Sequence, residues 1–259
     1  MDGFLTLLAK SFPALDAALA AGILIFARMM GFIMIAPVFN RKEIPVIAKV
    51  GFVFILTITL TGVLNPAPPP VNNSLFLSIV LNLTVGLMIG YMARLILIAI
   101  DAGADMINMQ MGLSSAMVLD PTSQTQISIL EKYFSLLAIL LFIQLGGIYW
   151  LFQAFLRSFE LFPIYATSIP LAKIVNMEYL IQMTSNVLYM GLQIASPVLL
   201  ATLGQDIILG IISKTAPQVN VFQLSFLFKP VLGAAILIWI LPMLVNIIND
   251  YFLSFSHII

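Results

Sequence analysis

The chain has 259 residues, of which 61% are hydrophobic and 8% charged, whereas an ordinary soluble protein carries about 25% charged residues. This composition predicts an integral membrane protein and excludes an ordinary soluble domain. Basic and acidic residues balance at 11 each, so no basic surface for nucleic acid is expected.

The residue types needed for several common chemistries are missing. The chain has no cysteine and a single histidine, His257, which removes thiolate nucleophiles, the usual zinc motifs and a serine-histidine-aspartate triad. Asp101 and Asp105 form the one close carboxylate pair in the apolar part, and the glycine-aspartate motif of intramembrane aspartyl proteases does not surround them. We therefore expect no enzymatic activity, no metal and no cofactor.

Long apolar stretches dominate the chain, and about 20 such residues suffice to cross a bilayer. Prolines and glycines inside them predict kinked helices that pack on other helices. Gly146 and Gly147 predict a close helix contact, and the polar tract 213–229 predicts a turn. With no internal repeat, we expect one all-α unit of integral membrane-type helical hairpins. The predicted helices cover residues 15–36, 46–64, 75–100, 127–156, 177–212 and 230–248.

Five of the charged residues within or beside these stretches are candidates for a functional role. An ionisable side chain inside a membrane helix is by default a functional candidate that needs a partner. Arg94, Asp101 and Asp105 share one helical face, since steps of seven and four residues are whole turns. They form either a functional charge network or a structural ion pair at an interface. The candidate network consists of Arg28, Arg94, Asp101, Asp105 and Asp206.

After Asp105 the sequence becomes rich in methionine, small hydroxyl residues and glycine. Flexible thioethers suit a surface that must seal and re-pack, although methionines also fill gaps in ordinary helix packing. Two functional classes fit the chain from its residues alone. One is a proton- or cation-coupled transporter using Asp101, Asp105 and Asp206. The other is a structural subunit of a larger channel, which accounts for the overlong, kinked helices together.

Two segments decide between these classes by resemblance. Residues 102–114, AGADMINMQMGLS, continuing to Asp120-Pro121, resemble the signature of the FliR family, the flagellar type III export-gate proteins whose injectisome counterpart is SctT. Residues 214–222, KTAPQVNVF, resemble that family's turn between its last two helices. The family commonly has glutamate where this chain has Asp105. The chain is thus identified as a member of the FliR family, and we favour the flagellum over the injectisome.

The resemblance implies a subunit of a hetero-oligomeric export gate in the bacterial inner membrane, within the flagellar basal body. It implies FliP-like and FliQ-like neighbours, FlhB-like and FlhA-like export components, and unfolded flagellar export substrates as partners. Residues 1–259 would form one export-gate domain, with a FliP-like part to about residue 170 and a FliQ-like part from about 171. By motif match, the 106–118 loop would plug the closed pore, and a second set would shape the cytoplasmic-side turn. The plug residues are Met106, Met109, Gln110, Met111, Gly112, Leu113, Ser114, Ser115, Ala116 and Met117, and the turn residues are Pro217, Gln218, Asn220 and Phe222.

Overall fold

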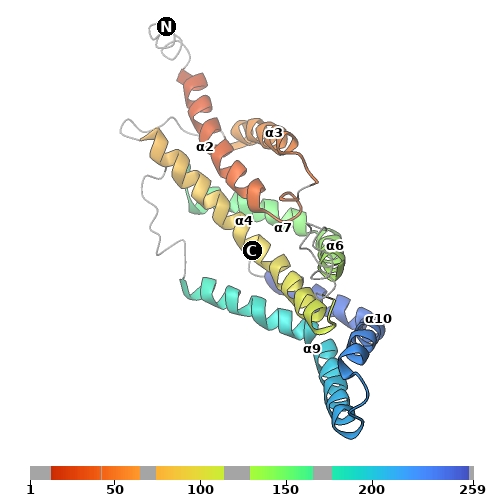
Figure 1. Ribbon diagram of the computed structural model, residues 1–259. Coiled ribbons are helices and arrows are strands. Elements are labelled where there is room, and N and C mark those ends of the chain that lie inside the picture. The colour runs from red at the N-terminus through yellow and green to blue at the C-terminus, as the bar shows by residue number, and fades with distance from the viewer. Residues whose placement is uncertain (1–12, 42, 65–73, 114–128, 166–176, 257–259) are drawn as a thin grey trace. The chain divides into compact units, whose positions relative to one another are not determined.

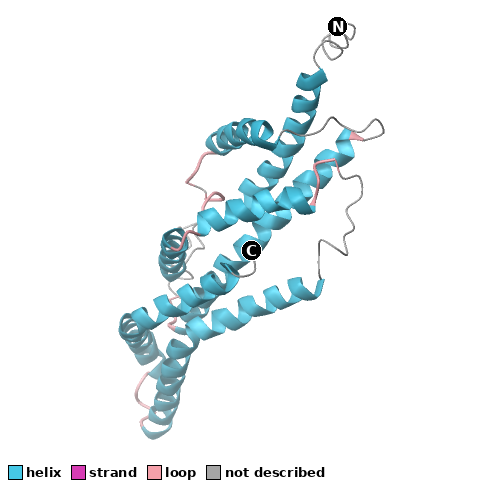
Figure 2. Cartoon of the chain, turned by 180° about the vertical axis from the view of Figure 1, so that it is seen from behind, coloured by secondary structure: helices cyan, strands magenta, loops and turns pink. Residues whose placement is uncertain are grey.

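A computed structural model describes residues 13–41, 43–64, 74–113, 129–165 and 177–256. Within these residues the regular structure is all helical, as predicted (Figures 1 and 2). Five of the described helices are long and apolar enough to cross a membrane, or up to six if one broken pair counts as a single span. The helices are α2 (Pro13–Ile35), α3 (Val46–Leu64), α4 (Leu75–Gln110), α6 (Ile129–Gln144), α7 (Gly147–Leu161), α9 (Met177–Thr215) and α10 (Val221–Ser256).

The helix α4 extends ten residues beyond the predicted end at Ile100 and finishes at Gln110. Residues 106–110 are therefore helical, and the prediction that the loop begins at Met106 was wrong. The helix continues because residues 101–110 contain no proline and keep a buried face at Gly103, Ala104 and Ile107. Of the predicted plug residues, Ser114, Ser115, Ala116 and Met117 lie outside the described part of the chain.

The predicted helix over residues 127–156 is instead two helices, α6 and α7. Gly146 adopts a φ of 78°, a left-handed conformation that glycine reaches without steric cost and that ends helices. Its N–H donates to the carbonyl of Ile143 at 3.0 Å, which closes the last turn of α6. Gly147 packs against the ring of Phe142. The glycine pair thus breaks the helix as well as allowing a close contact.

The last helix, α10, begins at Val221, nine residues before the predicted start at Pro230. Asn220 caps it, because its side-chain oxygen accepts a hydrogen bond from the backbone N–H of Gln223 at 3.2 Å. The predicted turn over 213–229 is accordingly reduced to the few residues between Thr215 and Val221. Pro230 lies inside the helix, as does Pro242.

The helix α9 carries Pro197 in its interior, and Figure 1 shows that the helix changes direction along its length. A proline has no N–H for the carbonyl four residues earlier, which here belongs to Gln193. The hydroxyl of Ser196 donates to that carbonyl at 3.0 Å and satisfies it. The side chain beside the proline therefore offsets the hydrogen bond that the helix loses.

The chain divides into two compact units. Unit 1 comprises residues 1–94 and 148–177, and unit 2 comprises residues 95–147 and 178–259. The helix α4 contributes its first half to unit 1 and its second half to unit 2. The predicted division near residue 170 into FliP-like and FliQ-like parts stays a prediction.

In unit 1, α2 and α4 approach each other through three glycines. A Cβ atom at Gly31 would lie 2.5 Å from the carbonyl oxygen of Leu83, and one at Gly90 would lie 2.8 Å from that of Phe32. A Cβ at Gly86 would collide with the carbonyl of Arg28. Small residues spaced by four let apolar helices come into backbone contact, so these glycines fix the distance between α2 and α4.

In unit 2, a second glycine pair joins α4 to α9. A Cβ at Gly103 would lie 3.0 Å from both the carbonyl oxygen of Gly191 and the side chain of Ile194. This contact holds the second half of α4 closely on α9.

The helices α6 and α10 meet through the rings of Phe142 and Phe252, whose centroids are 5.5 Å apart in an edge-on arrangement.

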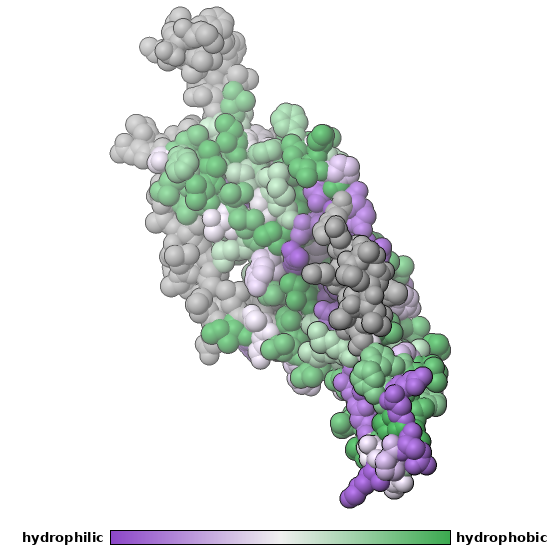
Figure 3. Space-filling model, viewed as in Figure 1, coloured by the Kyte–Doolittle hydropathy of each residue, from purple (hydrophilic) through white to green (hydrophobic). Residues whose placement is uncertain are grey.

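Large apolar side chains remain exposed on several helices. Within the described residues, α3 buries only Lys49, Val53 and Thr57, which lie one turn apart on a single face. Figure 3 shows hydrophobic residues over much of the visible surface and hydrophilic residues at the turn between α9 and α10. Surfaces of this extent need lipid or protein to cover them.

Candidate functional site

Arg28 lies in the middle of α2 with 1% of its surface exposed. Its guanidinium makes four hydrogen bonds to other described residues of unit 1. The Nε atom donates to the side-chain oxygen of Asn82 at 3.0 Å, and Nη2 donates to the backbone carbonyl of Phe162 at 2.7 Å. Nη1 donates to the carbonyl and the hydroxyl of Ser158 at 2.9 and 3.2 Å. The buried arginine therefore connects α2 to α4 and to the end of α7.

The carbonyls that receive Arg28 belong to the C-terminal end of α7, which ends at Leu161. The last four carbonyls of a helix lack intrahelical partners, and this end carries a partial negative charge. A cation placed there satisfies the carbonyls and interacts favourably with the helix dipole. Among the described residues, no carboxylate lies within ion-pair distance of Arg28. The partner of this charge is thus a helix end.

Two further contacts complete the Arg28 site. The guanidinium carbon lies 4.3 Å from the centre of the Phe159 ring, a cation–π arrangement. The Asn82 amide nitrogen donates to the carbonyls of Ser78 and Ile164 at 2.7 and 2.9 Å, which fixes its oxygen toward Arg28. The Ser158 hydroxyl donates to the carbonyl of Phe155 at 2.6 Å. Each polar group beside the arginine is therefore held in one orientation.

The other charges predicted to form one network lie in separate settings. Arg94 is exposed in unit 1, and its guanidinium donates to the side-chain oxygen of Asn40 at 3.1 Å when the Asn40 amide is oriented to donate to the carbonyl of Met34. Asp101 and Asp105 are half-buried on the unit 2 half of α4. Whether these charges act together stays a prediction.

The C-terminal end of α4 is closed by a Schellman motif. The N–H of Leu113 donates to the carbonyl of Asn108 at 3.2 Å, and the N–H of Gly112 donates to that of Met109 at 3.1 Å. Gly112 has a φ of 73°, and a Cβ there would meet no atom of the described residues within 4 Å. A glycine is therefore needed at position 112 for its positive φ, and not because a larger side chain would collide with a neighbour.

The methionines at this end of α4 face different surroundings. Met111 is buried, and its thioether lies against α10, where a Cβ at Gly233 would be 2.8 Å from Sδ. Met109 has 70% of its surface exposed. Met106, Gln110 and Leu113 are half-buried. One methionine therefore docks the helix end while another faces outward.

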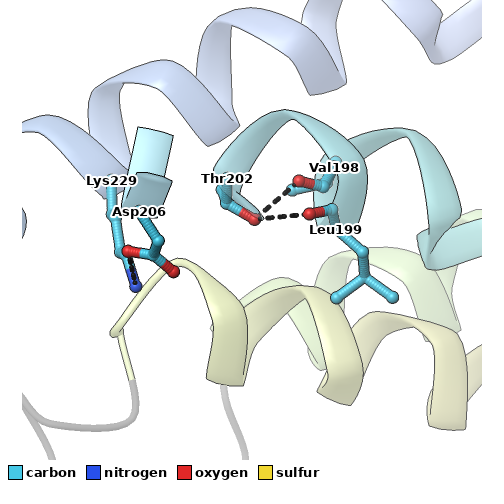
Figure 4. A network of polar contacts seen from close by, with 5 residues as sticks. All are labelled: Val198, Leu199, Thr202, Asp206 and Lys229. Carbon is cyan, nitrogen blue, oxygen red and sulfur yellow. Dashed lines mark hydrogen bonds and ion pairs between the residues drawn. The ribbon is translucent and has the colours of Figure 1, made fainter. Parts of the chain in front are cut away.

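Asp206 of α9 is paired with Lys229 of α10. The Lys229 ammonium lies 2.8 Å from a carboxylate oxygen of Asp206, and both side chains are partly exposed. One turn earlier in α9, the hydroxyl of buried Thr202 donates to the carbonyls of Val198 and Leu199 at 2.8 and 3.1 Å (Figure 4). The ion pair thus joins α9 to α10.

The predicted turn residues lie between α9 and α10. Pro217 and Gln218 are exposed in the turn itself, and Asn220 caps α10. Phe222 is exposed in the first turn of α10, and its ring lies 4.8 Å from that of Phe226. The Asn-x-Phe pattern therefore supplies both the cap and an exposed aromatic pair.

Sequence reasoning missed the residues that complete two of these sites. Asn82, Ser158 and Phe162 receive Arg28, and Lys229 pairs with Asp206. Asn82 and Lys229 carried a usable signal, because each is a polar side chain in an apolar helix. The carbonyl of Phe162 carried none.

These features define a membrane-embedded, all-helical protein with long helices and no metal cluster among its described residues. A family model described as "Bacterial export proteins, family 1" matches residues 19–255. Flagellar biosynthetic protein FliR of Bacillus subtilis (strain 168) is 25% identical over 241 residues, which cover 90% of each chain. FliR of Escherichia coli (strain K12) is 25% identical over 222 residues, which cover 84% of this chain and 82% of the relative.

A third relative, FliR of Pectobacterium carotovorum, is 27% identical over 226 residues, which cover 85% of this chain and 83% of the relative. The chain belongs to the FliR family of bacterial export proteins. The family assignment made from the sequence is thereby confirmed. It is a membrane-embedded flagellar export component that works in an apparatus with other components.

Proposed function

We propose that the chain is a structural and gating subunit of the flagellar type III export channel in the inner membrane. It closes an assembly with FliP-like and FliQ-like subunits and meets FlhB-like and FlhA-like export components. The segment 106–118 plugs the pore through which unfolded flagellar proteins leave the cytoplasm. The chain contributes positioning and sealing, and it catalyses no reaction.

The end of α4 is the observation that carries this proposal. The Schellman motif ends the helix at Gly112, and Met111 docks that end on α10. The Gly103–Gly191 contact holds the preceding turns on α9. A segment that starts from a fixed helix end and carries flexible thioethers can seal a pore by apolar contact and yield to a substrate.

The exposed apolar faces support the assembly part of the proposal. Ile47 of α3 is 86% exposed and Trp239 of α10 is 84% exposed. Both side chains lie among other exposed apolar residues, and exposing such a patch to water is unfavourable. Partner helices and lipid together would cover these faces.

The experiment that tests the plug uses Met109, which is exposed at the end of α4. Met109→Asp places a charge on this outward-facing position without disturbing the buried packing of Met111. The proposal predicts increased ion leakage through the resting assembled channel, while Met109→Leu behaves as wild type. Normal leakage and normal secretion with Met109→Asp would refute the plug.

The transporter alternative stays a prediction. Of its three candidate ion-binding carboxylates, Asp101, Asp105 and Asp206, the last is already paired with Lys229 at 2.8 Å. This pairing favours the channel subunit over the transporter.

A further inference from the structure

We infer that Asp206 and Lys229 form an electrostatic latch that holds the last turn of α4 against the α9–α10 hairpin. The latch consists of these two side chains, and the object that it positions is the segment from Ile107 to Leu113. The contacts that carry it all lie in unit 2. The gating consequence of the latch, though not the latch itself, rests on the function proposed above.

Helix geometry places the ion pair beside the end of α4. Lys229 and Gly233 are four residues apart on α10, so they share one face and lie one turn from each other. Gly233 is the residue on which Met111 packs, with Sδ 2.8 Å from a Cβ placed there. In the view of Figure 4, the pale yellow ribbon of α4 runs below the pair. The latch is therefore about one helical turn from the Met111 contact.

The charges in this arrangement complement one another. The C-terminal end of a helix carries about half a negative charge, which attracts a cation within its last turn. Lys229 is paired with the Asp206 carboxylate at 2.8 Å, and one turn from the Gly233–Met111 contact its ammonium would also face the negative end of α4. The carboxylate in turn neutralises an ammonium that would otherwise stand alone in apolar surroundings.

In this arrangement, removing Lys229 and removing Asp206 have different effects on the end of α4. Without Asp206, the lysine still interacts favourably with the end of α4. Without Lys229, the Asp206 carboxylate is left unpaired beside a helix end of the same sign, which repels it. The latch therefore predicts that loss of the lysine frees the end of α4 more than loss of the aspartate does. Loss of both leaves no unpaired charge and has an intermediate effect.

The natural chain has no cysteine, so one introduced thiol reports on a single position. Leu113→Cys at the end of α4 is labelled with a soluble maleimide in the full-length chain, assembled with its export-gate neighbours in native membranes. We expect Lys229→Gln to raise the labelling rate roughly threefold to tenfold, in line with a surface-type ion pair plus a helix-dipole contact. Asp206→Asn gives a smaller increase, and Lys229→Arg leaves the rate at the wild-type value.

The charge exchange and a matched control separate the latch from general loosening of the hairpin. Asp206→Lys combined with Lys229→Asp restores the pair and lowers the labelling rate below that of Lys229→Gln. Lys214→Gln makes the same substitution at the exposed end of α9 and is expected to change nothing. A labelling rate unchanged by Lys229→Gln, or raised at least as much by Asp206→Asn, would overturn the latch.

Two further outcomes are informative. If Lys229→Gln fails to accumulate, the latch is tested with Asp206→Asn and with the double variant Asp206→Asn, Lys229→Gln. The latch requires both variants to be labelled faster than wild type. A labelling rate equal to that of wild type overturns it. Ion leakage is measured on the same membranes. Faster labelling with unchanged leakage supports the latch and refutes the plug, whereas unchanged labelling refutes the latch whatever the leakage.

Discussion

Replacing Arg28 with methionine removes the charge and the hydrogen bonds while keeping a long apolar side chain in the same space. Four bonds are lost, to Asn82, to Phe162 and twice to Ser158, at 2.7 to 3.2 Å. The Ser158 carbonyl keeps its bond from the N–H of Phe162 at 2.9 Å. Among the described residues, no other donor reaches the Asn82 side-chain oxygen or the Phe162 carbonyl.

The magnitude follows from these two stranded acceptors. A buried acceptor that loses its partner costs about 1–3 kcal/mol, and removing a buried charge returns part of that cost. We therefore expect Arg28→Met to lower the free energy of unfolding by about 3 kcal/mol. At about 2–4 °C per kcal/mol for a chain of this size, the midpoint of thermal unfolding falls by roughly 6–12 °C.

The assay is thermal unfolding of the purified full-length chain in mild detergent, followed by fluorescence of the two tryptophans. Arg94→Met is the matched control, because Arg94 is exposed and, among the described residues, its side chain bonds to the reoriented Asn40 amide alone. Its midpoint should fall by no more than about 3 °C. An Arg28→Met midpoint within about 2 °C of wild type would refute the assignment of the α7 end as the partner of this charge.

Three further predictions concern helix packing and the end of α4. Gly86→Ala should lower the free energy of unfolding by about 1–3 kcal/mol, because the added Cβ collides with the carbonyl of Arg28. Gly112→Ala should cost about 1 kcal/mol through its positive φ, whereas Gly112→Asn should cost less, since asparagine tolerates this conformation. Met111→Ala should cost about 2–4 kcal/mol through the cavity left against Gly233, and it should raise the labelling rate at position 113. Thermal unfolding measures all three.

Each of these predictions has an outcome that contradicts it. Gly51→Ala is the control for Gly86→Ala, because a Cβ at Gly51 meets nothing within 4 Å; helix propensity should make it neutral or stabilising by up to about 1 kcal/mol. Equal effects at the two glycines would remove the argument for close α2–α4 contact. Equal midpoints for Gly112→Ala and Gly112→Asn would contradict the Schellman assignment. A Met111→Ala variant as stable as wild type would show that the thioether does not dock α4.

The apolar stretches predicted most helices because burial in lipid or in neighbouring helices needs long hydrophobic runs. The bounds of α3 agree with the prediction at both ends, Val46 and Leu64. Prolines on one side and an Asn-Pro sequence on the other mark these ends locally. Where such local signals are strong, sequence alone places a helix well.

The errors fall where a local signal has two meanings. Gly146-Gly147 suggested a close helix contact, and the pair also ends α6 because Gly146 takes a positive φ. Pro230 suggested a helix start, although the asparagine cap at position 220 was the better signal. Gly86-Leu-Met-Ile-Gly90 is a small-residue pattern for helix contact, and the structure uses it in that way.

The candidate sites were predictable only in part. Arg28 was identified as a charge that needs a partner, and the sequence alone could not show that the partner is the end of a helix about 130 residues away. Backbone carbonyls carry no sequence signature, and their position depends on long-range packing. The same holds for Met111, whose docking on Gly233 depends on the fold of α10.

The central claim is that this chain completes an export channel with other subunits. Native mass spectrometry of the chain extracted in mild detergent, produced alone and with its FliP-like and FliQ-like neighbours, tests that claim most directly. We predict a single large complex that contains all three proteins when they are produced together. A stable particle of this chain alone, unchanged by the presence of those neighbours, would contradict the claim.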